Sequence, residues 1–225
     1  MSASVAQKRR HEAPARTHLA WCREHGIDVV DGQWTLENPI SGLLLAAVLQ
    51  RSSAAPLLNI LCGQSWNQIQ VTSAWWPSSV VDLMVGFVAD GSAHMLILEN
   101  KHLDSNSNQP GHQKLTRLGR MDEVLWQTEK MLCDIDDARV AGDTRLLGGP
   151  FDPAATIHPV LLDASERTMD EAFPMYDWMV PAHRHDHWAT VSYSELAEGL
   201  RAHYEHDPIP MLEPLLSQIF AFAKG

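Results

Sequence analysis

Two acidic side chains and a lysine stand where two apolar segments of the chain could bring them together. Asp82 precedes the first of these segments, and Glu99 and Lys101 close the second. Asp90-Gly91 between the segments favours a two-residue hairpin loop, because both residues tolerate a positive φ. The register of such a hairpin places Asp82 directly opposite Glu99, and the alternation of side chains along a strand puts Lys101 on the same face.

This arrangement predicts a cation site. Carboxylates that face each other across two strands destabilise the pair unless something neutralises them. A divalent cation would do so, since hard cations take carboxylate oxygens as ligands. Two carboxylates beside a lysine suit metal-assisted hydrolysis, in which the cation activates water and the lysine transfers a proton or stabilises a developing negative charge.

The hairpin resembles the active site of the PD-(D/E)XK nuclease superfamily, where an acid on one strand and an acid-x-Lys on the next hold magnesium beside a phosphodiester. The first acid is Asp82, preceded by Val81 where the family name has proline, and the acid-x-Lys is Glu99-Asn100-Lys101. The resemblance implies Mg²⁺, with Mn²⁺ as a substitute, bound by Asp82, Glu99 and the carbonyl oxygen of Asn100. Lys101 would then orient or deprotonate the attacking water, or stabilise the charge that develops.

Two further positions match the same family. Glu37 stands at the entrance of an apolar helical stretch that we expect over residues 37–50, with Asn38 as the N-cap. Many family members carry a glutamate there that reaches the metal through water. An acid favourably placed at the positive end of a helix dipole is the alternative reading. Gln113 opens a helix expected over residues 112–136 and resembles a glutamine of one family branch, although a surface or capping role is common for such a residue.

The remaining pattern predicts an α/β fold with a central mixed β-sheet flanked by helices. A strand over residues 66–76 precedes the hairpin, so three consecutive strands form a meander. Residues 156–162 read as another strand, whose Pro159 suggests its beginning or an edge. Residues 188–200 read as a short strand entering a helix, capped by Ser192 or Ser194. The order Trp, strand, Ser-Tyr-x-x-Leu also recurs in the family, and the resemblance implies a restriction-endonuclease-like core.

The composition is that of one globular domain. Of 225 residues, 45% are hydrophobic and 20% charged. We interpret residues 1–16 as a flexible basic arm and residues 17–225 as a single domain. No apolar run approaches the roughly 18 residues that span a bilayer, and no signal peptide is evident, so we expect a cytoplasmic protein without a membrane partner. The three widely spaced cysteines, which favour reduced thiols over a disulfide framework, agree with that location.

The net charge of −11 bears on the partner. Broad affinity for nucleic acid normally comes from lysine and arginine on phosphates, so an acidic chain needs a local basic rim or a bound metal to approach DNA. We expect a DNA endonuclease serving defence, restriction or repair. The alternative is a catalytically inactive module of the same fold that binds a nucleic acid or a protein partner. A homodimer is compatible with either function.

Two other groups of residues could do chemistry. His183, His185 and His187 alternate and would share one face of a strand, where they could bind zinc. The interleaved charges favour a solvated loop instead. Trp75 and Trp76 stand just before the hairpin and could stack on bases, although packing in the core or at its rim is the safer interpretation.

Overall fold

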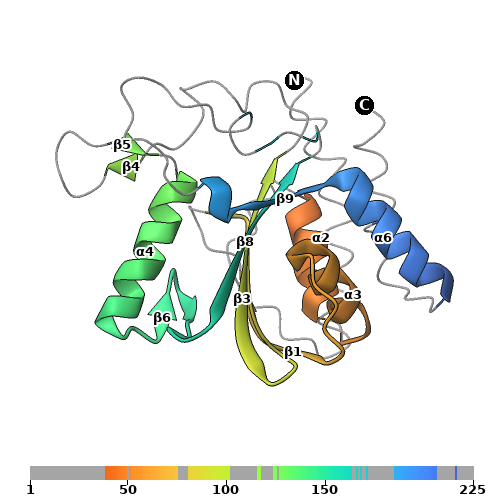
Figure 1. Cartoon of the computed structure of the whole chain (residues 1–225), viewed down its shortest axis with the longest axis horizontal. Helices are drawn as coiled ribbons and strands as arrows, with labels where there is room; N and C mark the ends of the chain where they lie inside the picture. Colours follow the sequence, from red (N-terminus) through yellow and green to blue (C-terminus); the bar gives the residue numbers. More distant parts are fainter. Residues whose placement is uncertain are drawn as a thin grey trace, which may run out of the picture.

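The structure is a computed structural model that describes a large part of the chain: residues 39–49, 51–75, 81–101, 116–117, 124–125, 127–163, 166, 168, 171, 185–206 and 216. Five strands of this part form one mixed sheet with helices on both faces (Figure 1). The α/β class and the flanked mixed sheet expected from the sequence are therefore confirmed.

The sheet has the order β1-β2-β3-β8-β9. Its strands are β1 (Ile69–Trp75), β2 (Leu83–Ala89), β3 (Ser92–Lys101), β8 (Thr156–Asp163) and β9 (Ala189–Ser192). The first three are antiparallel neighbours, which confirms the predicted meander, whereas β3 pairs with β8 and β8 with β9 in parallel. The carboxyl ends of β3 and β8 consequently lie together at one edge of the sheet.

In the described part of the chain, one group of helices covers one face of this sheet and a further helix covers the other face (Figure 1). The first group is α2 (Pro39–Leu49), α3 (Arg51–Cys62) and α6 (Tyr193–His206). On the opposite face lie α4 (Gln127–Ala141) and the small hairpin of β6 (Arg145–Leu146) and β7 (Gly149–Pro150). None of the helices in the described ranges is long and apolar enough to cross a membrane.

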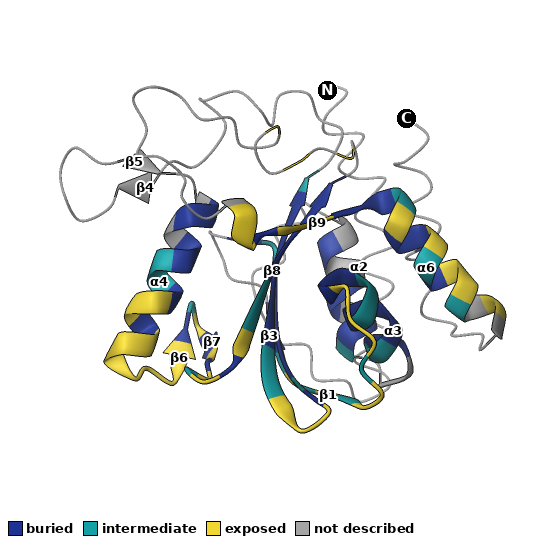
Figure 2. Cartoon of the chain, viewed as in Figure 1, coloured by how far each residue is buried: buried dark blue, intermediate teal, exposed yellow. Residues whose placement is uncertain are grey.

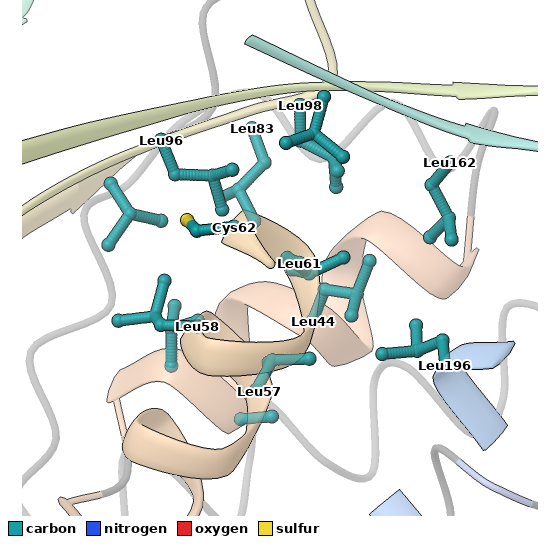
Figure 3. Packing of buried hydrophobic residues seen from close by; sticks show 14 of the residues in the cluster. Leu44, Leu57, Leu58, Leu61, Cys62, Leu83, Leu96, Leu98, Leu162 and Leu196 are labelled. Carbon is teal, nitrogen blue, oxygen red and sulfur yellow. The ribbon is translucent and has the colours of Figure 1, made fainter. Parts of the chain in front are cut away.

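Each face of the sheet has its own apolar core, because successive side chains of a strand point to opposite faces. Leucines of α2 and α3 meet leucines of the strands on the first face, as Figure 3 shows for Leu44, Leu58 and Leu98. Methionines and Ile97 meet the inner side of α4 on the second face. The strands between these layers are largely buried, and exposed residues gather on the outer sides of α4 and α6 (Figure 2). Full burial of one such leucine is worth about 2 kcal/mol, so both layers hold the sheet firmly.

The central hairpin forms as its sequence predicts. Asp90 and Gly91 make the loop with φ values of 45° and 85°, the positive range that favours Asp-Gly here. Ala89 pairs with Ser92, and the register continues without a shift to Leu83 opposite Leu98. The Asp90 carboxylate also accepts the backbone N–H of Gln68 at 3.0 Å, which ties the turn to the start of β1.

The prediction of a helix over residues 112–136 is wrong for the first part of that range. Within that range the structure has a short antiparallel pair, β4 (Thr116–Arg117) and β5 (Val124–Leu125), and α4 begins only at Gln127. The leucines of this segment are compatible with helical spacing, but Thr116 and Val124 are β-branched and Gly119 weakens a helix.

Two details of the neighbouring helices also differ from expectation. The helix expected to end at residue 136 continues as α4 to Ala141, so the exposed acids Asp136 and Asp137 lie in its body. Helix α3 carries Pro56 and has no counterpart among the expected elements. Its leucine-rich inner side is buried against the sheet, and this tertiary packing outweighs the cost of the proline.

Pro159 is the fourth residue of β8, an interior strand of the sheet, so the expected strand beginning or edge is wrong for the strand as a whole. Pro159 pairs with Ile97 of β3 on one side. On the other side the pairing of β8 with β9 begins only at Val160, opposite Ala189. The proline therefore stands just before the second ladder begins, where a missing N–H is tolerated.

Candidate functional site

The candidate site lies at the edge of the sheet where β3 and β8 end. The closing residues of β3 are Glu99, Asn100 and Lys101, and Asp163 closes β8. The amino end of α4 is at the same edge (Figure 1), with the buried polar residue Thr128 in its first turn. Open α/β sheets commonly bind ligands outside the carboxyl ends of their parallel strands, so this edge is a reasonable place for chemistry.

Glu99 and Lys101 lie on one face of β3, as the alternation predicts. Lys101 Nζ donates to Oε1 of Glu99 at 2.5 Å, and the side chains are 16% and 3% exposed for lysine and glutamate respectively. The ammonium thus neutralises the buried carboxylate and remains partly accessible itself.

Asp82 lies beside this pair, but the regular ladder stops one residue short of it. The backbone N–H of Asp82 donates to the carbonyl of Leu98 at 2.9 Å, the residue already paired with Leu83. Oδ2 of Asp82 accepts the backbone N–H of Asn100 at 2.7 Å. The carboxylate therefore takes the place of the next backbone acceptor in the ladder. This correction to a simple facing pair still keeps Asp82 against the Glu99-Asn100-Lys101 segment.

Asn100 directs its side chain to the opposite face of the sheet. Its Nδ2 donates to Oγ of Ser41 in α2 at 3.2 Å, and its Oδ1 accepts the hydroxyl of Tyr193 in α6 at 2.5 Å. Ser41, Asn100 and Tyr193 are all buried. The use of the Asn100 carbonyl oxygen as a metal ligand stays a prediction.

Tyr193 and Asp163 are site residues that sequence reasoning missed. The parallel register sets Asp163 beside Lys101, and its side chain is fully buried. The pKa of Tyr193 is raised well above its ordinary value, first by burial and then by the nearby carboxylates of Asp82 and Asp163, against the lowering effect of the bond to Asn100. An acid at the end of the apolar run 156–162 was the available signal for Asp163, but only the strand order reveals its neighbour.

The remaining predicted residues divide into those the structure describes and those it does not. Glu37 and Gln113 lie outside the described residues, as do His183 and Trp76. Trp75 is buried and packs on Gly149, which agrees with a core role. His187 is exposed in η2 (His185–His187), beside Asp186. Free thiols are found at both described cysteines, Cys62 and Cys133, as expected.

The donor set at the sheet edge suits a hard cation. Among the described residues, no three His, Cys, Asp or Glu side chains are grouped closely enough to hold a metal ion. Mg²⁺ does not need such a group, because it usually keeps several waters and binds through one or two carboxylates. Asp82, just before β2, and Glu99, near the end of β3, provide two carboxylates. This pair contains no thiolate or imidazole, the ligands that would favour zinc.

A separate hollow of about 220 Å³ lies farther down the sheet, lined in part by Gly86 and Met95. Along β3, Met95 is four residues from Glu99, or about 13 Å at the rise of a strand. The hollow is therefore distinct from the site of the acids.

Comparisons of the chain with protein-family models, with curated proteins and with solved structures found no match in any of the three. The class of the protein must therefore be argued from the arrangement of Asp82, Glu99 and Lys101.

Proposed function

We propose that this protein is a Mg²⁺-dependent nuclease of the PD-(D/E)XK type, with a restriction-endonuclease-like core and DNA as its substrate. The observation that carries the proposal is the placement of Glu99 and Lys101 on one face at the end of β3, with Asp82 hydrogen-bonded to the residue between them. The antiparallel hairpin followed by a parallel neighbour, β8, supports the proposed core.

In this proposal Asp82 and Glu99 hold Mg²⁺, together with the carbonyl oxygen of Asn100. The cation, when bound, supplies positive charge to a phosphate oxygen and lowers the pKa of water. With Glu99 engaged in holding the cation, the ammonium of Lys101 would be available to orient the attacking water or to stabilise charge on the phosphate. The partial exposure of Lys101 leaves its head group accessible for this role. Glu37 and Gln113 remain proposed supporting residues for the water and the metal ligands.

The energetics of the Glu99–Lys101 pair favour a functional role. A buried ion pair repays its desolvation only in part, so packed apolar residues at the same positions would serve stability at least as well. Glu99 is only 2% exposed. The fold alone therefore gives little reason for an acid and a lysine just after the buried apolar run 95–98 of β3.

The second candidate is a catalytically inactive module of the same fold that binds a nucleic acid or a protein. The net charge of −11 favours it, because phosphate contacts need positive side chains. The acid-x-Lys arrangement favours the enzyme, because a binding module has no need for it. Phage defence, restriction and repair are the proposed settings, and a homodimer or a regulatory partner is compatible with each.

Cleavage assays distinguish the two candidates. Supercoiled and linear DNA, with RNA alongside, are incubated with the protein and Mg²⁺ or Mn²⁺, and EDTA is added to a parallel set. Lys101→Ala and Asp82→Asn are each expected to slow cleavage by about 10²- to 10⁴-fold, as for loss of a group that moves a proton or holds the cation. Asp137→Asn is the matched control, since Asp137 is an exposed acid on α4. Equal rates for wild type and Lys101→Ala on every substrate would exclude the enzyme.

A further inference from the structure

Asn100 is a polar residue in an apolar layer. Its side chain points to the face of the sheet on which Leu98, Leu162 and Leu196 form the first core, and the residue is 4% exposed. Burial of an amide costs free energy unless its donors and acceptor are paired. An apolar residue would suit this position better if packing were its only task.

The amide is paired through two different helices. Ser41 of α2 accepts from Nδ2 at 3.2 Å, and Tyr193 of α6 donates to Oδ1 at 2.5 Å. The backbone N–H of the same residue donates to Oδ2 of Asp82 at 2.7 Å. Asn100 thus connects α2, α6 and the segment before β2 to the end of β3.

The hydrogen bonds of Asn100 also orient its two neighbours in the strand, Glu99 and Lys101. Side chains alternate along a strand, so fixing Asn100 on the helix-covered face fixes Glu99 and Lys101 on the other. The residue lies next to the carboxyl end of β3, where the β2–β3 ladder has already ended at Leu98. Beyond Leu98, the orientation of the end of β3 therefore depends on its pairing with β8 and on the hydrogen bonds of Asn100.

The hydroxyl of Tyr193 is a buried donor to Asn100. Tyr193 is 1% exposed, and its O–H donates to Oδ1 of Asn100 at 2.5 Å. The Asn100 amide is then held in one orientation, with its oxygen toward Tyr193 and its nitrogen toward Ser41.

We propose that Ser41, Asn100 and Tyr193 form a positioning clamp, which sets the direction of Glu99 and Lys101 and their placement relative to Asp82. The cation affinity of the site then depends on two hydroxyl groups that do not touch the cation. This inference rests on the proposed function, since it assigns these residues to the same metal site.

Stability and positioning can be separated by the choice of variants. When all partners of a buried hydrogen bond are replaced by apolar groups of similar shape, the free energy of unfolding changes little. The triple variant Ser41→Ala, Asn100→Leu, Tyr193→Phe removes the whole clamp in this way. Tyr193→Phe alone removes one hydroxyl and keeps the ring.

A matched control comes from the adjacent residue. Ser192 caps α6: its Oγ accepts the N–H of Glu195 at 3.0 Å, and the Glu195 carboxylate accepts the N–H of Ser192 at 2.7 Å. Ser192→Ala weakens the start of the same helix without removing a contact of Asn100.

The experiment measures Mn²⁺ binding to the full chain by calorimetry, cleavage of DNA with Mn²⁺, and unfolding in urea. The dissociation constant for Mn²⁺ is expected to rise about 10- to 100-fold in Tyr193→Phe and in the triple variant, as is typical when groups that orient metal ligands are lost. Ser192→Ala should bind Mn²⁺ as wild type does, although its urea midpoint falls. The triple variant should unfold near the wild-type midpoint; if it fails to fold, the comparison of Tyr193→Phe with Ser192→Ala decides.

Each outcome has one interpretation. Unchanged Mn²⁺ binding in Tyr193→Phe overturns the clamp, while cleavage by the wild type keeps the proposed function intact. Equal loss of Mn²⁺ binding in Tyr193→Phe and Ser192→Ala also overturns it, because the effect then follows helix stability. A wild type that binds Mn²⁺ but cleaves no nucleic acid contradicts the nuclease and leaves the clamp to be judged from binding. A wild type that does neither removes both proposals.

Discussion

The ammonium of Lys101 lies 2.5 Å from Oε1 of Glu99, two residues earlier on the same strand. Alternation places both side chains on the α4 side of the sheet, where β3 ends. Asp163 of β8 stands beside Lys101 in the parallel register. Among the described residues, Lys101 thus places a positive charge between the ion-paired Glu99 and its strand neighbour Asp163.

Removing the lysine should destabilise the protein. In Lys101→Met the buried Glu99 carboxylate loses its ion pair, and the expected fall in the free energy of unfolding is about 3 kcal/mol at pH 7. The double variant Lys101→Met, Glu99→Gln should recover part of this loss, because the carboxylate that was ion-paired with Lys101 is then uncharged as well. Urea unfolding of the three proteins tests the pair, and a Lys101→Met protein as stable as the wild type would contradict its proposed importance.

Divalent cations should stabilise the folded chain. A ligand that binds only the native state raises the free energy of unfolding by about 2.7 kcal/mol at a concentration 100-fold above its dissociation constant. Thermal unfolding with increasing Mg²⁺ or Mn²⁺ should therefore shift the midpoint upward, and EDTA should reverse the shift. Asp82→Asn is expected to lose the response, whereas Asp137→Asn should retain it. An identical shift in Asp82→Asn would place the cation elsewhere.

The stability of the protein should fall as the pH drops from about 6.5 to about 4. His158 Nε2 lies 3.0 Å from Nδ1 of His94, and both rings pack against Trp66. Burial, and then the proximity of His94, lower the pKa of His158 to about 4 from an ordinary 6.5. Between these two pKa values, His158 takes up a proton in the unfolded chain but not in the folded chain. The stability is therefore fully present above the unfolded pKa of 6.5 and is lost as the pH falls toward the folded pKa of about 4.

The size of this effect is limited because His158 is only partly buried. A shift of one unit corresponds to about 1.4 kcal/mol, and solvent screening reduces the total to about 1–2 kcal/mol. The measurement is urea unfolding between pH 7.5 and 4 for wild type and His158→Leu, with the exposed His187→Gln as control. A pH dependence that His158→Leu leaves unchanged would assign it to other groups.

The two described cysteines should differ in reactivity. Burial raises the pKa of Cys62 to about 12, whereas Cys133 is partly exposed on α4. Because only the thiolate is a nucleophile, iodoacetamide at pH 8 should label Cys133 in the native protein and spare Cys62. Peptide mapping by mass spectrometry distinguishes the sites, and labelling in urea should reach both. Rapid native labelling of Cys62 would show that the core near α3 opens readily.

The parts of the site that the sequence predicted are those governed by neighbours in the chain. Asp90-Gly91 determines the hairpin loop, and the loop determines the register through to Leu83 and Leu98. Alternation then puts Glu99 and Lys101 on one face. The N-cap of α6 is likewise a local feature, because Ser192 accepts the N–H of Glu195, three residues further along the chain.

Where local signals compete, sequence reasoning failed. The leucines of residues 112–136 suited a helix, but the structure pairs Thr116 with Leu125 and starts α4 at Gln127. Asp82 illustrates a smaller failure. The register predicted its place beside Glu99, but the backbone leaves the ladder there and the carboxylate bonds to the N–H of Asn100 instead.

Only the tertiary structure decided what surrounds Asn100 and Lys101. Ser41 stands 59 residues before Asn100 and Tyr193 stands 93 residues after it. No periodicity connects such distant positions, because they meet only once α2 and α6 have packed on the same face of the sheet. Asp163 lies beside Lys101 only because β8 pairs with β3 in parallel. The chain's local chemistry thus determined the hairpin with its acids and lysine, and burial of both sheet faces decided which distant residues hold and surround them.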